Sequence, residues 1–255
     1  MTPALCTLAF GELEPASAWG VGLVRESGGS ALTALGAGDT SAVLPDVRFS
    51  AGSDGEEWRL DGDAAELVVA PAGEAVAVQS TEDALQGWEQ LCRVTGRFER
   101  GGTAHAVDCL GLRSRWSDAI DVERYESIRS VSVWFEPDEG VAEGMALTAF
   151  RPRKAKGHDR DVLAAAVIAA DVSRAVEDPR LSTTYQAEGW PARAGLELWL
   201  AGDEPDQQYP RRVSGEATGP RVEALADGQE VRAQPFRWHS RGREGAGMYL
   251  LARRR

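Results

Sequence analysis

Residues 86–118 constrain the fold more than any other stretch, because they join a long β-hairpin to a cluster of arginine and tryptophan. A turn at Gly101-Gly102 connects two extended runs, and glycine pairs of this kind favour tight hairpin turns. With this turn, one face is largely apolar and the other mainly polar, as a half-buried antiparallel pair requires. The apolar face contains Cys92, Val94, Gly96, Phe98, His105, Val107, Cys109 and Gly111. The polar face contains Arg93, Thr95, Arg97, Glu99, Ala104, Ala106, Asp108 and Leu110.

Strand signals continue along the rest of the chain, and helix signals are scarce. Short apolar runs alternate with turns that contain glycine, proline and aspartate, which is typical of antiparallel sheets. Residues 81–86 suit a helical turn, and residues 161–177 suit either a helix or a long bent strand. The sequence therefore predicts an all-β protein with little helix. Hairpins are expected over residues 19–35, 47–60, 66–79 and 128–150.

Two similar β domains in tandem account for the length of 255 residues. Closely spaced strands predict antiparallel sandwiches or barrels. The tripeptide Val94-Thr95-Gly96 is echoed by Val213-Ser214-Gly215, as a duplicated unit would produce. We expect an N-terminal domain over residues 1–118 and a C-terminal domain over residues 119–255.

Composition limits the partners of the protein. Acidic residues outnumber basic ones by 40 to 28, giving a formal net charge of -12, so a nucleic acid would be repelled on average. The longest apolar run, residues 162–170, is far shorter than the ~20 residues that span a bilayer. The N-terminal segment has neither the charged nor the apolar part of a signal peptide. We expect a cytoplasmic protein with no nucleic-acid partner and no membrane span.

Signatures of cofactor binding are missing from the sequence. It contains no dinucleotide or phosphate-loop glycine motif and no Gly-x-Ser-x-Gly nucleophile motif. Cys6, Cys92 and Cys109 have neither a metal-ligand spacing nor that of a disulfide framework, and the three histidines lie far apart. The sequence thus predicts no metal and no nucleotide cofactor.

The run GWEQLCRVTGRF, followed by a Gly-Gly turn and AVDCLGLRSRW, resembles a known family. This is the tandem lipocalin-like family of carotenoid 1,2-hydratase (hydroxyneurosporene synthase) and fungal Diels–Alderases, which has an actinobacterial branch. The resemblance implies two lipocalin-like barrels and a small hydrophobic ligand or substrate. The family carries an arginine, an acid, a histidine and a tryptophan after this strand pair. With Trp116 aligned to that tryptophan, this chain has Ser114 near the histidine position and Arg113 near the acidic one.

Arg113, Arg115 and Trp116 follow the second strand of the hairpin and are candidates for a ligand-binding barrel mouth. A tryptophan there can pack on an apolar ligand while an arginine holds its carboxylate or carbonyl group. Trp88 and Trp134 are further candidates, because bulky rings can line an apolar cavity. The alternative is structural: Trp116 closes the space between the barrels, the other rings fill cores, and the arginines form ion pairs.

Asp108, Tyr125 and Glu126 are the candidate catalytic residues. A carboxyl group inside a barrel acts as a general acid if desolvation raises its pKa. For Asp108 the alternative is a salt bridge with Arg93 or Arg97. Tyr125 and Glu126 offer a phenol and a second carboxyl group, without a spacing that makes them specific.

These observations support three functional hypotheses. The first is binding of a small hydrophobic molecule of isoprenoid, polyketide or acyl type, in a barrel cavity or in the cleft between barrels. The second is a cofactor-free hydratase, isomerase or cyclase that acts on an unsaturated hydrophobic substrate by general acid catalysis. The third is a structural or protein-interaction module without a cavity. The first two rest on analogy of fold, which is a weak guide to function.

Overall fold

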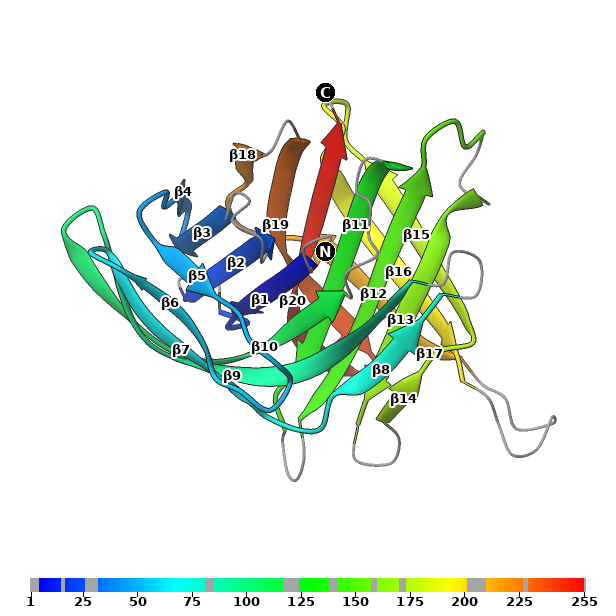
Figure 1. The fold of residues 1–255 in the computed structure, drawn as a ribbon, viewed down its shortest axis with the longest axis horizontal. Coiled ribbons are helices and arrows are strands. Elements are labelled where there is room, and N and C mark those ends of the chain that lie inside the picture. The colour runs from blue at the N-terminus through cyan, green and yellow to red at the C-terminus, as the bar shows by residue number, and fades with distance from the viewer. Residues whose placement is uncertain are drawn as a thin grey trace.

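The chain folds into two curled antiparallel sheets that lie side by side (Figure 1). The all-β prediction is therefore confirmed. Within the described part of the chain there is no helix with the length and hydropathy needed to span a bilayer. The computed structural model describes residues 5–14, 17–25, 32–80, 85–116, 124–137, 142–156, 160–169, 173–200, 210–226 and 229–254.

The first sheet is formed by strands β1 to β10, and we call the curled unit the first barrel. Its strands are hydrogen-bonded in the order β4-β3-β2-β1-β10-β9-β7-β6-β5, and β8 pairs separately with β9. The strands are β1 (Leu5–Gly11), β2 (Ala18–Arg25), β3 (Leu32–Ala37), β4 (Thr40–Val43), β5 (Arg48–Ser50), β6 (Trp58–Gly62), β7 (Ala65–Pro71), β8 (Val76–Gln79), β9 (Gln86–Arg100) and β10 (Thr103–Trp116).

The second sheet is formed by strands β11 to β20, and we call it the second barrel. Its order is β14-β13-β12-β11-β20-β19-β17-β16-β15, with β18 paired separately to β19. The strands are β11 (Tyr125–Phe135), β12 (Glu143–Pro152), β13 (Val162–Ile168), β14 (Ser173–Ala175), β15 (Asp178–Tyr185), β16 (Pro191–Trp199), β17 (Arg211–Ala217), β18 (Val222–Ala226), β19 (Gln229–Ser240) and β20 (Arg243–Arg254).

The two sheets repeat one topology, because β11 to β20 occupy the places of β1 to β10 in the same order. The tripeptide echo in the sequence does not mark this repeat correctly. Val94-Thr95-Gly96 lies in β9, whereas Val213-Ser214-Gly215 lies in β17, which has the place of β7. Three matched residues are too few to fix an alignment of strands. The sheet changes between β10 and β11, and the expected junction at residues 118 and 119 lies outside the described residues.

The hairpin of residues 86–116 has the predicted register. His105 pairs with Phe98 and Asp108 pairs with Thr95, and both turn glycines, Gly101 and Gly102, have positive φ values of 56° and 77°. A left-handed backbone at both positions is the conformation that a tight hairpin turn needs and that glycine adopts without strain. The predicted apolar face points into the first barrel.

One local prediction is corrected, and one open choice between helix and strand is decided. Residues 66–79 do not form a hairpin, because β8 pairs with β9 rather than with β7. Strand β9 is long enough to pair with β7 along one part and with β8 along another, so β8 gains its hydrogen bonds there. The 161–177 segment contains strands β13 and β14. Of the expected helical turn at 81–86, residues 81–84 lie outside the described residues, and Gln86 begins β9.

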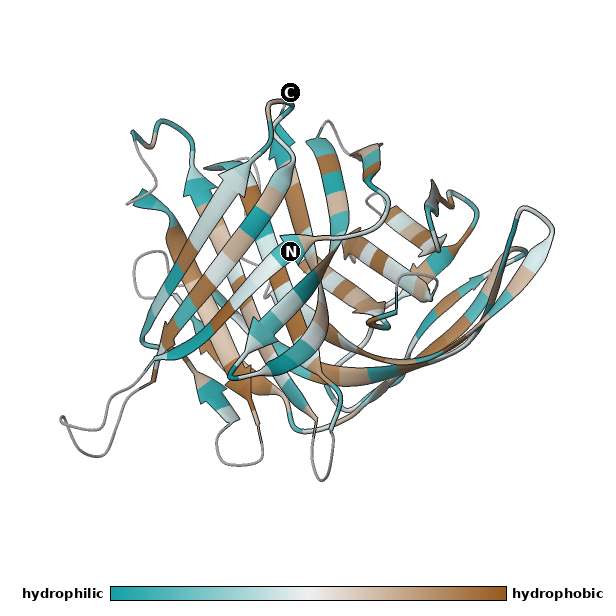
Figure 2. Ribbon diagram, turned by 180° about the vertical axis from the view of Figure 1, so that it is seen from behind, coloured by the Kyte–Doolittle hydropathy of each residue, from teal (hydrophilic) through white to brown (hydrophobic). Residues whose placement is uncertain are grey.

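Apolar side chains gather in three places: inside each barrel and between the two sheets. Figure 2 shows the alternation of hydrophobic and hydrophilic bands along the strands that this requires. The first barrel encloses residues such as Phe10 and Trp58, and the second encloses Leu147 and Trp238. The core between the sheets draws on both, including Leu91, Leu112, Trp116, Phe150 and Met248.

The contacts between the sheets have an approximate two-fold relation. Strand β8 of the first barrel packs on β13 and β14 of the second, and the equivalent strand β18 packs on β3 and β4 of the first. A hydrogen bond of 3.0 Å from Ser41 Oγ to the Arg221 carbonyl joins the second of these pairs. The faces between the sheets are thus covered from both ends.

Candidate site between the two sheets

Arg113 and Trp88, two of the predicted ligand-binding residues, lie together inside the first barrel. The Arg113 guanidinium lies 4.8 Å from the centroid of Trp58 and 5.7 Å from that of Trp88. It donates hydrogen bonds to the side-chain oxygen of Gln90 at 2.7 and 2.9 Å. Arg113 has no exposed surface. A guanidinium that is stacked and hydrogen-bonded in this way holds its surroundings in one geometry.

The remaining donors of Arg113 bind the loop between β5 and β6. Nη2 donates to the Asp54 carbonyl at 2.6 Å and Nη1 to the Glu56 carbonyl at 2.8 Å. Arg115 donates from Nη1 to the Gly52 carbonyl at 3.1 Å. Both arginines therefore fasten this loop across the mouth of the first barrel. Their binding of a ligand stays a prediction, and their observed partners are protein groups.

Asp108 lies on the exposed part of the hairpin, far along β10 from the other candidates. Its Oδ1 accepts a hydrogen bond of 2.6 Å from Arg93 Nε, and 64% of its side chain is exposed. This hydrogen bond lowers the pKa of Asp108, so the side chain is ionised at neutral pH and carries no proton to donate. The salt bridge with Arg93 is the alternative that the sequence had left open.

Trp116 and Tyr125 meet between the two sheets, around Phe150 of β12. The ring of Phe150 lies 5.1 Å from Trp116, edge to face, and 5.3 Å from Tyr125, measured between centroids. All three side chains are buried. These residues come from β10, β11 and β12, so the cluster joins the first sheet to the second. The structural alternative for Trp116, closing the space between the barrels, describes its position.

Glu89 is a carboxyl group buried beside this aromatic cluster. Glu89 lies two residues before Leu91 in β9, so both side chains are on the face that points into the space between the sheets. It pairs with Ser114 on one side and with Val76 on the other. It is 3% exposed, and burial raises its pKa to about 8. Among the described residues its carboxyl has no hydrogen-bond or ion-pair partner. An acid kept neutral by desolvation can donate a proton at neutral pH.

A groove opens next to Glu89, where the edge of the first sheet meets the second. Its volume is about 930 Å³. Val78 and Gly87, two cross-strand pairs away from Val76 and Glu89, line it from the first sheet. Strands β13 to β15 supply the other wall, and Figure 1 shows β8 lying close to β13 and β14. The volume of the groove lies within the range of roughly 300–1,000 Å³ that is usual for small-molecule pockets.

Gly87 contacts Trp116 of the aromatic cluster and also lines the groove. A Cβ atom at this position would lie 2.6 Å from the Arg115 carbonyl oxygen and 2.9 Å from the Trp116 ring. Only glycine therefore lets β9 approach Trp116 this closely. The buried indole of Trp116 therefore lies against Gly87, which itself lines the groove.

Two predicted residues lie elsewhere. Trp134 is near the far end of β11, where its Nε1 donates to the Gly11 carbonyl at 3.0 Å. Glu126 lines a pocket in the mouth of the second barrel, at a point where the register between β11 and β12 shifts and leaves it unpaired. The structure thus brings Trp116 and Tyr125 to one place, and Arg113 and Trp88 to another.

Sequence reasoning missed Glu89, although a signal for it exists. The face of the hairpin that carries Asp108 was assigned to solvent, yet further along it carries Leu91, Leu110, Leu112 and Trp116. Counting by twos along β9 places Glu89 on this same apolar face. Glu89 lies next to Leu91 on the apolar part of this face, and this position, unlike that of Asp108, indicates a buried acid. Within the described ranges, no group of three or more histidine, cysteine or acidic side chains could hold a metal ion.

Comparison with solved structures identifies the fold. A candidate AttH protein from Nitrosomonas europaea superposes with a TM-score of 0.60 at 11% identity, over 98% of this chain and 92% of the other. CghA crystallised with Sch210972 gives 0.62 at 13% identity, over 99% and 89%. The chain has the tandem lipocalin-like fold.

Kievitone hydratase from Nectria haematococca shares this fold, with a TM-score of 0.55 at 10% identity, over 98% of this chain and 88% of the other. No protein-family model matches the sequence, and no curated protein matches it either. The resemblance stated from the hairpin motif is thus confirmed at the level of the fold. At identities this low the likeness carries no activity to this chain, which has to be inferred from its own residues.

Proposed function

We propose that this protein binds a small hydrophobic molecule in the groove between its sheets and uses Glu89 as a general acid on it. The observation that carries the proposal is the position of Glu89: a neutral carboxyl group with no partner among the described residues, next to an aromatic cluster and a groove. Acids with strongly raised pKa values cluster at functional sites. Two of the neighbours in fold support the direction, one by its name as a hydratase and one by its bound small molecule.

The internal repeat supports a functional role for this acid. The residue equivalent to Glu89 in the second barrel is Gln229, because each precedes its hairpin turn by the same number of pairs. Gln229 is also buried. A neutral amide therefore meets the packing needs of this position in the other half of the molecule. The carboxyl group at position 89 adds an ionisable proton that the packing does not require.

The chemistry needs only proton transfer. The Glu89 carboxyl adds its proton to one carbon of a C=C bond, and the electron pair of that bond forms the new C–H bond. The positive charge on the second carbon is stabilised by the faces of Trp116 and Tyr125. Water adds to the cation and its lost proton returns to the Glu89 carboxylate, which completes a hydration. Loss of a proton from the cation instead would give an isomerisation.

Binding is tested with the neutral fluorescent probe N-phenyl-1-naphthylamine. Its fluorescence should rise saturably with wild-type protein and fail to rise with Ala77→Trp, which fills the groove from β8. Ala104→Trp, an exposed alanine on β10 outside the groove, is the matched control and should bind the probe normally. Equal binding by both variants would show that the groove is not the site.

Catalysis is tested in D₂O with a panel of isoprenoid, polyene and acyl alkenes. Mass spectrometry should detect deuterium or added water in at least one substrate with wild type, and with Glu89→Gln the rate should drop by about 100-fold or more. Glu66→Gln, an exposed glutamate on β7, should retain activity. Probe binding with no turnover of any alkene would leave a binding protein and contradict the acid role.

A further inference from the structure

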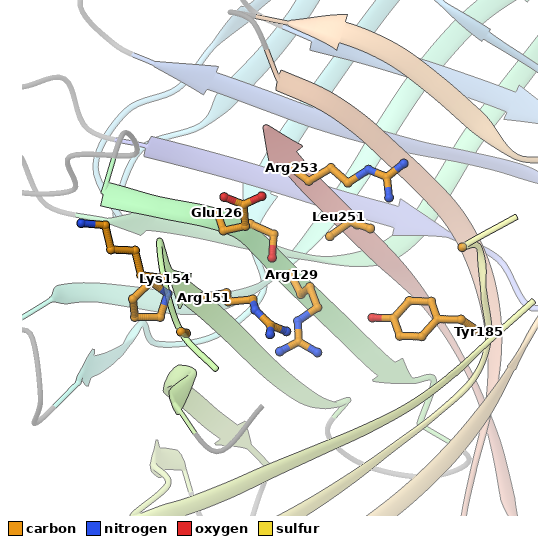
Figure 3. Close-up of a pocket in the computed structure, with 11 residues that line it drawn as sticks. Glu126, Arg129, Arg151, Lys154, Tyr185, Leu251 and Arg253 are labelled. Carbon is orange, nitrogen blue, oxygen red and sulfur yellow. The ribbon is translucent and has the colours of Figure 1, made fainter. Parts of the chain in front are cut away.

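The mouth of the second barrel contains a pocket that is separate from the groove. Its volume is about 580 Å³, and its described lining includes Arg129, Arg151, Lys154 and Arg253 but a single carboxylate, Glu126 (Figure 3). The chain as a whole has a net charge of -12. A strongly cationic lining in an acidic protein concentrates positive potential where it can attract an anion.

Three of the arginines surround one small residue, Ser127. On β11, Ser127 pairs with Arg151 of β12 on one side and with Arg253 of β20 on the other. Arg129 follows two residues later on the same face, and this face continues into the apolar interior at Val131. Directly paired positions lie about 5 Å apart in antiparallel sheets. The three arginines thus start from positions around Ser127, and Figure 3 shows the guanidinium groups of Arg129 and Arg151 close together, with that of Arg253 on another part of the lining.

Arg129 is held firmly at the floor of this pocket. It forms an ion pair with Asp161, and only 7% and 2% of the two side chains are exposed. The hydroxyl of Tyr185 points toward Arg129 (Figure 3) and lies 3.3 Å from the hydroxyl of Tyr249, which in turn lies 3.1 Å from Thr183 Oγ1. Burial raises the pKa of Tyr249, so this phenol stays protonated. The floor thus offers fixed hydrogen-bond donors.

The first barrel contains an arginine equivalent to Arg253, and there the arginine binds a loop of the protein. Arg253 is the repeat equivalent of Arg113, since each has the same position relative to its hairpin turn and each pairs with a β9-type residue, Glu230 or Gln90. In the first barrel, carbonyl oxygens of the 51–57 loop occupy the donors of Arg113. The backbone carbonyl oxygens of Asp54 and Glu56 accept the hydrogen bonds that Arg113 could otherwise donate to a bound anion.

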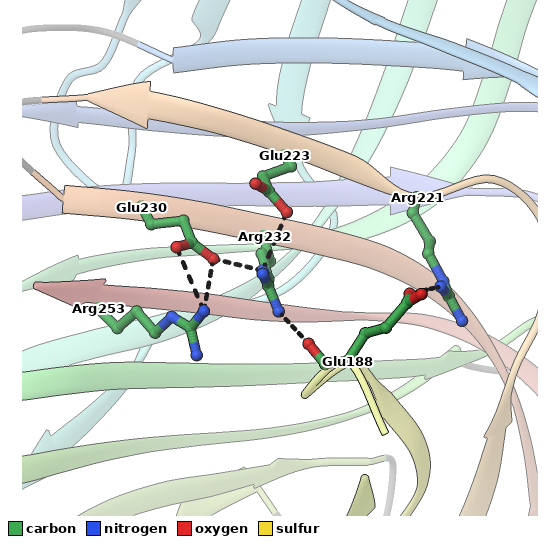
Figure 4. A network of polar contacts seen from close by, with 6 residues as sticks. All are labelled: Glu188, Arg221, Glu223, Glu230, Arg232 and Arg253. Atoms are coloured by element: carbon green, nitrogen blue, oxygen red, sulfur yellow. Dashed lines mark hydrogen bonds and ion pairs between the residues drawn. The ribbon is translucent and has the colours of Figure 1, made fainter. Parts of the chain in front are cut away.

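In the second barrel a different arginine fastens the equivalent loop. Arg232 of β19 stacks on Trp190 at 4.9 Å and donates to the Glu188 carbonyl at 2.9 Å (Figure 4). Arg253 is left with Glu230, whose two oxygens both bind its Nη2, at 2.9 and 3.2 Å. Its Nη1 and Nε have no acceptor among the described residues. In the second barrel the loop is therefore held by Arg232, and Arg253 lines the pocket.

We propose that the pocket at the mouth of the second barrel binds a small organic anion through its carboxylate or phosphate group. The oxyanion lies between the guanidinium groups of Arg129 and Arg151 and accepts charge-assisted hydrogen bonds from them, while Arg253 and Lys154 add positive charge elsewhere in the lining. The organic part packs on Leu251 and Pro152, which are apolar members of the lining. This site shares no residue with the groove beside Glu89, so the two proposals stand or fall separately.

Calorimetric titration of the full chain tests the proposal with phenyl phosphate, benzoate and the neutral analogue benzyl alcohol. At least one anion should bind, and benzyl alcohol should not. The anion that binds more tightly shows whether the site prefers a phosphate or a carboxylate. Arg151→Gln should weaken binding about 10-fold, the value of one charge-assisted hydrogen bond. Arg153→Gln, on the exposed turn just beyond the pocket, should leave it unchanged. Higher ionic strength should weaken binding.

Ser127→Glu gives an independent measurement that does not depend on the probe. The new carboxylate would lie among the three arginines, so the variant should have a raised melting temperature and lose the anion binding of the wild type. A lack of binding by both anions would overturn the proposal, as would equal binding of benzyl alcohol or equal losses in Arg151→Gln and Arg153→Gln. A Ser127→Glu variant with a lowered melting temperature would also overturn it.

Discussion

At the scale of single residues, the most informative group is the carboxyl of Glu89, because its protonation couples stability to pH. Its pKa is raised from 4.5 to about 8 by burial, so the folded protein binds one more proton than the unfolded chain between these pH values. The contribution of Glu89 to the free energy of unfolding is therefore complete below about pH 4.5. This contribution is lost progressively as the pH rises from about 4.5 through about 8.

Glu89→Gln removes this dependence, since an amide stays neutral at every pH. We expect the two proteins to have similar free energies of unfolding in urea at pH 5. At pH 9 the variant should be the more stable, by up to about 1.4 kcal/mol for each unit of the pKa shift. Glu66→Gln, at an exposed position, should follow the wild type at both pH values. If the stability of wild type does not fall relative to Glu89→Gln between pH 5 and 9, Glu89 is ionised in the fold.

At the scale of elements, cross-strand pairs of tryptophan and glycine let the strands pack closely. Trp19 of β2 pairs with Gly36 of β3, and a Cβ atom on Gly36 would lie 2.3 to 2.5 Å from atoms of the Trp19 indole. The ring lies across the glycine and takes the space that a side chain would need. This arrangement covers the bare backbone of a glycine in a strand.

Gly36→Ala should therefore destabilise the protein by about 1–3 kcal/mol, the usual cost of overpacking. In Trp19→Leu the space is open, so adding Gly36→Ala to that variant should cost much less. The free energy of unfolding of the four proteins, measured in urea, gives the coupling. Gly55→Ala, whose Cβ atom would meet nothing within 4 Å, should change little. Additive effects of Gly36→Ala and Trp19→Leu would show that the ring does not occupy this space.

The elements also show how far sequence patterns reach. The 86–116 hairpin was predictable to its register, because period-two apolarity and a Gly-Gly turn fix it locally. The pairing of β8 with β9 was not, because several strands compete for one partner and only the three-dimensional sheet decides. Glu89 and Ser114 look like solvent-facing residues along the chain. They are buried because a second sheet covers that face, and a strand's own pattern cannot show what packs on it.

The arginine sites show the same limit. Arg113 was predicted to bind a ligand at a barrel mouth, and this stays a prediction. The loop carbonyls that it binds come from residues 54 and 56, too far along the chain for spacing to indicate. The cationic pocket of the second barrel draws on β11, β12, β15 and β20. No motif joins these strands in the sequence, because the topology brings them together only after the sheet closes.

At the scale of the whole molecule, the core between the sheets makes the two barrels interdependent. This core is apolar and contains residues of both halves, such as Leu112 of β10 and Phe150 of β12. Separating the barrels would expose it to water, which is unfavourable in proportion to the area exposed. We therefore infer that the barrels unfold together, as one cooperative unit.

The cysteines provide a test of this coupling. Cys6, Cys92 and Cys109 are buried and form no disulfide. All three lie inside the first barrel, so their labelling by a thiol reagent reports on its opening. Leu147→Ala creates a cavity in the second barrel, where Leu147 has no exposed surface, and should cost about 2–5 kcal/mol.

In a single cooperative unit, this loss in the second barrel should accelerate thiol labelling in the first, by about tenfold for each 1.4 kcal/mol lost, when labelling is measured in moderate urea. Leu225→Ala, at a position that is 62% exposed, is the matched control and should label at the wild-type rate. An unchanged labelling rate in Leu147→Ala, despite a lower overall stability, would show instead that the first barrel keeps its fold when the second opens. The groove between the sheets would then be a hinge between independent domains rather than a fixed binding site.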